Sequence, residues 1–303
     1  MLSLDHRPVS VRVTLPLQGK GPGDAPGGRG RRVGIYSCRV PRQKPLTWKT
    51  GYAPTWKDRH IESAWLAEHW VYGGRIHEEA AAALAAAFNS PSTRSVGHSL
   101  YFKLFAEFAN ALEVAGAWGW VMRTRREHPL LLDAFLTYPL SAPRDFYLAA
   151  RRNRSGSLIQ LLKLPPEDKV VPALDAAIQD WTAEECRQSL AEAVRQSKFL
   201  AGRYFDHNEI IRTAYNRAKH GATMLHDKSL SNREFWVIAP HLEITGPRDT
   251  ARYDLPKFTV SGQGIRDLQK NIEIAGSLIR YLAGLARALN DAGLLYGKRT
   301  RRP

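Results

Sequence analysis

Three side chains that could bind a phosphate and exchange a proton recur at four-residue intervals in one short stretch of the chain. Arg212, Asn216 and His220 supply a guanidinium, an amide and an imidazole. At about 100° per residue, groups spaced by four drift only ~80° around a helix axis over two steps, so all three share one side of a helix. A guanidinium neutralises phosphate, and an imidazole gains or loses a proton near neutral pH. We therefore take Arg212, Asn216 and His220 as the candidate catalytic residues.

The helix expected to position this row has a start and an end in the sequence. Asp206 and Glu209 have the spacing of a capping box, which satisfies the free N–H groups of a first helical turn. Gly221 suits the left-handed residue just past a helix end. Apolar residues at helical spacing form the other face: Ile210, Ile211, Ala214 and Ala218. The pattern predicts one helix over 206–220.

The end of this predicted helix resembles a known bacterial signature. Residues 215–221 read Tyr-Asn-Arg-Ala-Lys-His-Gly, similar to the Y-N-x-x-K-H-G motif of HEPN-like helical proteins, several of which are tied to phage or toxin defence. The resemblance implies that Tyr215, Arg217 and Lys219 bind substrate beside the candidate catalytic residues. It also implies a HEPN-like part over about 98–295, in which a strand pair and a last long helix follow the motif.

The resemblance leaves the chemistry open. Catalytic HEPN members are metal-independent RNases with four to six residues between an Arg and a His, whereas seven separate Arg212 from His220 here and two separate Arg217 from it. Such an RNase lets the 2′-OH of RNA attack the phosphate while a base and an acid move the protons, and a homodimer would bring two His220 side chains together. The alternatives are binding of RNA or a protein partner without cleavage, and a scaffold in which Lys219 and His220 only complement the helix dipole.

The histidines between His207 and His241 keep open a further alternative, a small-molecule enzyme of unknown class. No HExxH or Glu-x-x-His spacing occurs in the sequence, and such spacings place two metal ligands on one helical face. The two cysteines, Cys38 and Cys186, also lack the spacing of a zinc site. We therefore expect no metal and no cofactor.

Two clusters of arginines stand at the ends of two other predicted helices. Each could contact phosphates, or could simply complement the negative end of a helix dipole, which is the interpretation that the sequence favours. The clusters are Arg123, Arg125 and Arg126, and Arg151, Arg152 and Arg154.

The net charge of +15 is concentrated at the two ends of the chain. Residues 1–60 carry +9 and residues 298–302 carry +4, which leaves +2 for 61–297. Basic ends attract any polyanion in a salt-dependent way. We predict an irregular N-terminal segment over 1–60 with a Gly/Pro/Arg linker at 19–32, a helical domain over 61–297 and a basic tail over 298–303.

Helical periodicity dominates the chain from residue 61 onward. The longest charge-free apolar runs have nine residues, against the roughly 20 that a membrane span needs, so we expect no membrane contact and a cytoplasmic protein. Extended segments between 233 and 260 predict a small antiparallel β-hairpin. The fold class is therefore mainly α, a helical bundle with this hairpin inserted before the last long helix. The predicted helices cover 61–71, 75–88, 98–126, 130–138, 144–151, 157–164, 182–204 and 265–295. Thr182 and Glu185 have the spacing of a capping box at the start of the 182–204 helix, and Cys186 falls on its apolar side as a small core residue.

Overall fold

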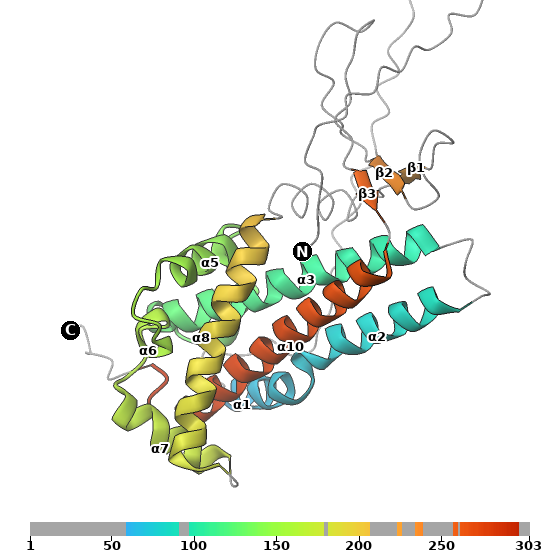
Figure 1. The fold of residues 1–303 in the computed structure, drawn as a ribbon. Coiled ribbons are helices and arrows are strands. Elements are labelled where there is room, and N and C mark those ends of the chain that lie inside the picture. The colour runs from blue at the N-terminus through green and yellow to red at the C-terminus, as the bar shows by residue number, and fades with distance from the viewer. Residues whose placement is uncertain are drawn as a thin grey trace, which may run out of the picture.

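Two long helices, α3 (Gly97–Thr124) and α10 (Gly262–Asp291), run through the middle of a helical bundle (Figure 1). The computed structural model describes residues 59–90, 97–178, 181–206, 223–225, 234–238, 257–259 and 261–296. The mainly α-helical bundle expected from the sequence is confirmed over these residues. The other helices are α1 (Arg59–Glu68), α2 (Arg75–Asn89), α4 (Leu131–Leu136), α5 (Ala142–Arg152), α6 (Leu158–Leu161), α7 (Glu167–Ala177) and α8 (Ala183–Asp206).

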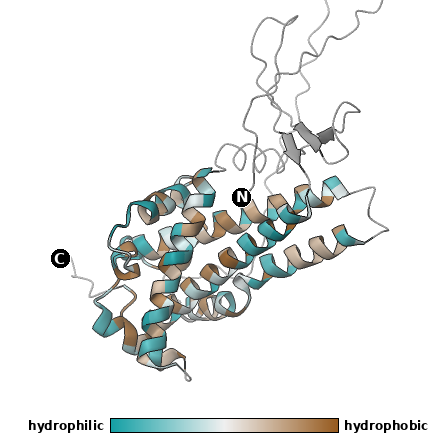
Figure 2. Cartoon of the chain, in the orientation of Figure 1, coloured by the Kyte–Doolittle hydropathy of each residue, from teal (hydrophilic) through white to brown (hydrophobic). Residues whose placement is uncertain are grey.

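The apolar rows of α3 and α10 form the centre of the core. On α3 the buried residues recur at steps of three and four, from Tyr101 through Phe108 and Trp118 to Met122. On α10 the row from Leu268 to Leu289 is likewise buried. Hydrophilic and hydrophobic residues alternate in bands along α10, as a helix with one solvent-facing side requires (Figure 2). Helical periodicity therefore predicted both central helices.

The helix α2 is fastened to both central helices by polar side chains. His77 is 5% exposed, and its Nδ1 lies 2.5 Å from Glu107 Oε1 on α3. The next residue, Glu78, accepts a hydrogen bond of 2.6 Å from Arg280 on α10. Neighbouring residues on a helix point about 100° apart, so the two side chains reach different partners and fix the position of α2.

The helix α8 begins with the capping box that the sequence predicts. The Thr182 backbone N–H donates to Glu185 Oε2 at 2.7 Å, and the Glu185 N–H donates to Thr182 Oγ1 at 3.3 Å. The Thr182 N–H, and then the Thr182 hydroxyl, which also donates to Glu185 Oε2 at 2.8 Å, hold the pKa of the Glu185 carboxyl below its usual value. Cys186 is buried in the core, as predicted.

Helix α7 was not expected from the sequence, because Pro172 lies inside it. Proline removes one backbone donor and normally interrupts a helix. Here the helix forms nonetheless, and its apolar side packs into the core through Val170, Val171 and Leu174. Packing of an amphipathic face has overridden the local preference.

Short strands lie between α8 and α10. They are β1 (Thr223–Leu225), β2 (Glu234–Ile238) and β3 (Lys257–Thr259), paired antiparallel in the order β1-β2-β3. Most of 207–260 lies outside the described residues, so the inserted hairpin stays a prediction. The same holds for the irregular segment and the basic tail, since 1–58 and 297–303 are not described. None of the described helices combines the length and apolar composition that a membrane span requires.

Candidate functional site

The residues of the predicted catalytic row lie outside the described residues. They are Arg212, Tyr215, Asn216, Arg217, Lys219 and His220. The described part of α8 runs to Asp206, the first residue of the predicted helix, so α8 leads directly into the segment that carries the row. Their roles stay predictions.

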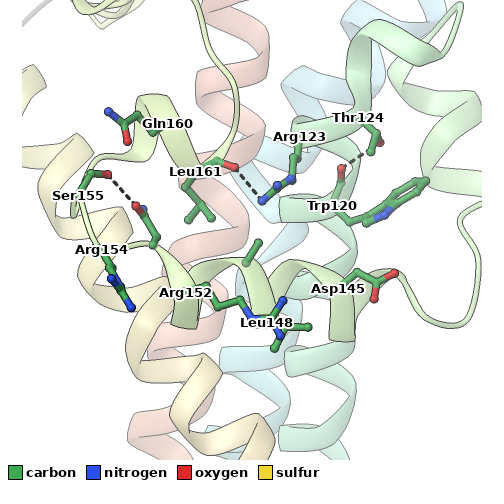
Figure 3. Close-up of a pocket in the computed structure, with 12 residues that line it drawn as sticks. Trp120, Arg123, Thr124, Asp145, Leu148, Arg152, Arg154, Ser155, Gln160 and Leu161 are labelled. Carbon is green, nitrogen blue, oxygen red and sulfur yellow. Dashed lines mark hydrogen bonds between the residues drawn. The ribbon is translucent and has the colours of Figure 1, made fainter.

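An open pocket of about 620 Å³ lies where the end of α3, the length of α5, the loop after it and α6 meet (Figure 3). This volume is in the range of small-molecule and cofactor sites, about 300–1,000 Å³. The lining residues are Trp120, Arg123, Thr124, Asp145, Leu148, Ala149, Arg152, Asn153, Arg154, Ser155, Gln160 and Leu161.

Both arginine clusters of the sequence contribute to this pocket. Arg123 comes from the last turn of α3, and Arg152 and Arg154 come from the end of α5 and the residues after it. Asp145 is the single carboxylate in the lining. Three guanidinium groups against one carboxylate make the pocket a positively charged site, which favours an anion.

The guanidinium groups of the pocket have few partners within the protein. Arg123 Nη1 donates to the Leu161 carbonyl at 3.5 Å, the long end of the range for a hydrogen bond. In the part of the chain that the structure describes, Arg152 and Arg154 are exposed and have no ion pair or hydrogen bond. Asp145 Oδ2 accepts from Ser141 Oγ at 3.0 Å instead of pairing with an arginine. These arginines are therefore available to a bound anion.

The loop after α5 is held in shape by its own side chains. Asn153 Nδ2 donates to the Ser157 carbonyl at 3.0 Å, and Ser155 Oγ donates to Asn153 Oδ1 at 2.7 Å. Ser155 Oγ also accepts from the Ser157 N–H at 3.2 Å. Gly156 has a φ of +67°, a conformation that glycine adopts without steric cost. This network fixes the backbone that carries Arg154.

Arg125 belongs to the core and not to the pocket. It is 0% exposed, and its guanidinium donates to the carbonyls of Met122, Leu162, Lys163 and Leu295 at 2.7–2.9 Å. Burial, and then the charge of Arg126, lower the pKa of Arg125 to about 10. Its bond to the Met122 carbonyl agrees with the predicted role of a cation at a helix C-terminus, and its other bonds join the end of α3 to the turn after α6 and to the residues after α10.

The two remaining arginines also point away from the pocket. Arg126 is exposed and does not line it. The Arg151 guanidinium lies over the Phe205 ring of α8, 5.5 Å from its centroid. Each cluster is therefore divided among different surroundings.

Beside the arginines, the pocket offers an aromatic and apolar wall. The half-buried Trp120 ring lies 5.8 Å from the His128 ring and is inclined to it by 55°. Leu148 and Leu161 add aliphatic surface. A ligand with a planar ring and an anionic group would find a partner for each.

The lining suits binding better than proton transfer. It contains no histidine or cysteine, and the hydroxyls of Thr124 and Ser155 both donate within the protein. Across the described ranges, no group of three or more His, Cys, Asp or Glu residues is arranged to hold a metal ion. The pocket can hold an anion by charge and hydrogen bonds.

Comparison of the chain with family models, with curated proteins and with solved structures finds no match.

Proposed function

We propose that this chain is a HEPN-like, RNA-binding module of the cytoplasm, and that its arginine-lined pocket takes a phosphate of the RNA. The observation that supports this proposal best is the convergence of Arg123, Arg152 and Arg154 on one pocket with a single carboxylate. Guanidinium groups bind phosphate through paired hydrogen bonds, and contacts to phosphate dominate the affinity for nucleic acids. The proposed HEPN-like fold includes the predicted β-hairpin before α10.

Two features favour RNA over a small anion. The net charge of +15 draws a polyanion towards the protein from a distance. Trp120 stands in the same lining as the arginines, and unpaired bases of RNA stack on aromatic rings and guanidinium planes. An isolated phosphate ion would use the arginines only.

Any cleavage of the RNA is assigned to the predicted row and not to the pocket. The pocket lining has no imidazole, so His220 is the proposed proton carrier, with Arg212 and Asn216 beside it. Tyr215, Arg217 and Lys219 would bind the same substrate, and a homodimer would supply a second His220. This version needs no metal and no cofactor.

The binding proposal is tested with the double variant Arg152→Ala/Arg154→Ala. A labelled single-stranded RNA is titrated with protein at several salt concentrations, and binding is followed by fluorescence anisotropy. Each phosphate contact contributes about −0.7 to the slope of log K against log salt for a single strand, so we expect the slope to become less steep by about 1.4 in the double variant. Arg126→Ala is the matched control, because Arg126 is exposed and does not line the pocket.

Three results would count against the proposal. An unchanged slope in the double variant would remove the pocket from RNA binding. A loss in Arg126→Ala about half as large as that in the double variant would reduce the effect to overall charge, because the control removes one positive charge and the double variant removes two. Equally tight binding of a polyglutamate peptide would favour a protein partner. Cleavage is tested separately, since His220→Ala should abolish it and leave the affinity for RNA intact.

A further inference from the structure

Between Glu192 and the terminal Asp206, helix α8 carries only positive charge. Between Glu192 and Asp206 its charged residues are Arg195, Lys198 and Arg203. At about 100° per residue, these side chains together with Phe199 and Gly202 fall within an arc of about 140°. The opposite side is buried, and includes Val194, Ser197, Leu200 and Ala201. We call the arc formed by Arg195, Lys198, Phe199, Gly202 and Arg203 the α8 outer face.

An aromatic ring and a guanidinium meet on this outer face. Phe199 is 37% exposed, and the Arg203 guanidinium lies over its ring, 5.1 Å from the centroid. A Cβ added at Gly202 would meet no atom within 4 Å, so the surface beside the pair is open. Aromatic rings flanked by arginine are platforms on which unpaired bases stack.

The outer face adjoins the rim of the pocket. Lys198 Nζ lies 4.0 Å from the position of a Cβ on Gly156, the residue directly after the pocket-lining Ser155. The contact of Arg151 with Phe205 also ties the end of α5 to α8. In Figure 1, α5 and the upper part of α8 lie next to each other. A chain that leaves the pocket over the Gly156 turn therefore reaches Lys198 first.

Lys198 and Arg203 stand at the two edges of the outer face and at different heights along the helix, with Phe199 between them. Arg203 lies five residues after Lys198, about 7.5 Å further along the helix axis. Among the described residues, neither Lys198 nor Arg203 has an ion pair. Arg195 differs from them because it pairs with Glu192.

We propose that single-stranded RNA continues from the pocket over the Gly156 turn onto the α8 outer face, where Lys198 and Arg203 bind phosphates and Phe199 stacks on a base. The inference rests on the proposed function of the pocket. It names the substrate as unpaired RNA, because a base can reach Phe199 only when it is not stacked in a duplex. The path runs towards the end of α8, from which the chain continues into the segment with His220.

The experiment compares a ligand that fills only the pocket with one long enough to reach α8. Adenosine monophosphate serves as the short probe and a single-stranded RNA of about ten nucleotides as the long one. Lys198→Ala/Arg203→Ala should make the dependence of log K on log salt less steep by about 1.4 for the RNA and leave the affinity for adenosine monophosphate unchanged. Phe199→Ala should weaken RNA binding by about 5- to 150-fold, the range for loss of one stacked base.

Arg187→Ala is the matched control on the same helix. Arg187 lies in the first half of α8, and its side chain is 52% exposed and paired with Glu167 and Glu184. Because it is about 24 Å from Arg203 along the axis, its loss should leave the binding of both probes unchanged. Thermal unfolding of each variant checks that the bundle is intact.

The outcomes separate this inference from the proposed function. If Lys198→Ala/Arg203→Ala binds the long RNA like the parent protein while Arg152→Ala/Arg154→Ala loses both probes, the path along α8 is wrong and the pocket stands. If the pocket variant keeps both probes, the proposed function is wrong and the inference with it. Equally tight binding of duplex RNA would overturn the stacking on Phe199.

Discussion

Replacing Arg125 tests the framework on which the pocket is built. This buried guanidinium donates to four backbone carbonyls from three separate parts of the chain. Two of them, Leu162 and Lys163, belong to the turn that ends α6, whose residues Gln160 and Leu161 line the pocket. The side chain therefore joins the last turn of α3 to the opposite wall of the pocket.

The expected loss of unfolding free energy in Arg125→Ala follows from the backbone carbonyls that the variant leaves without a donor. Four carbonyls lose a charged donor, and three of these hydrogen bonds are fully buried. An unmatched buried acceptor costs roughly 1 kcal/mol or more, so the loss is about 4 kcal/mol before relaxation. Removing a buried charge recovers part of this loss. We therefore expect the free energy of unfolding to fall by about 3 kcal/mol.

The assay is urea unfolding followed by circular dichroism, with Arg126→Ala as the control. Arg126 is exposed, and its replacement should change the free energy of unfolding by less than about 0.5 kcal/mol. Arg125→Lys keeps the charge but has one nitrogen in place of three, so it should fall between the control and the alanine variant. A loss below about 1 kcal/mol in Arg125→Ala would refute the reasoning, because it would mean that water or other donors satisfy the carbonyls.

Three further predictions concern the bundle itself. In Gly276→Ala the new methyl would lie 2.5 Å from Glu78 Oε1 and 2.8 Å from the Gly74 carbonyl oxygen. Thermal unfolding should show that this variant loses about 1–3 kcal/mol of unfolding free energy. Gly202→Ala, in open space on a helix, should instead gain up to about 1 kcal/mol. Lys163 has a left-handed φ of 51° just after α6. Because glycine adopts this conformation without steric cost, Lys163→Gly should raise the urea midpoint by the equivalent of about 1 kcal/mol. A lower midpoint would mean that the lysine side chain is needed there. Burial lowers the pKa of His69 below its ordinary value of 6.5, so the unfolded chain binds the proton more readily than the folded protein. The free energy of unfolding should therefore decrease as the pH falls below 6.5. Equilibrium unfolding between pH 7 and 5 should show a weaker decrease in His69→Phe, and equal pH dependence in both proteins would contradict this prediction.

The sequence predicted those parts of the fold that depend on local pattern. The apolar periods of α3 and α10 and the capping box of Thr182 and Glu185 all correspond to described features. Each is a property of residues three or four apart, which the sequence displays directly. The helix α7 escaped prediction because its stability comes from packing, which compensates for Pro172.

The pocket was beyond the reach of local pattern for a different reason. The sequence did draw attention to both arginine clusters, but a cluster at a helix end looks the same whether its groups meet a ligand, the core or solvent. Whether an arginine faces the pocket, the core or solvent depends on the position of α6, which is set by the turn at Lys163 and the contacts of Arg125. Those are long-range contacts, with no signature in the neighbouring residues. The Asn153-Arg154-Ser155-Gly156-Ser157 stretch was the one local signal of a tight turn beside the second cluster.

The geometry of α5 explains why the pocket and the α8 outer face belong together. Arg151 and Arg152 are adjacent in sequence, so their side chains leave the helix about 100° apart. The first meets Phe205 on α8 and the second lines the pocket. The end of α5 is thus a ridge with a basic surface on each side, and the turn at Gly156 is where the two surfaces join. A flexible single strand can bend over such a ridge, whereas a stacked duplex is stiff over many base pairs and can bend sharply only at a large cost in energy. If the proposed RNA path is correct, this ridge would favour an unpaired strand over a duplex independently of stacking on Phe199.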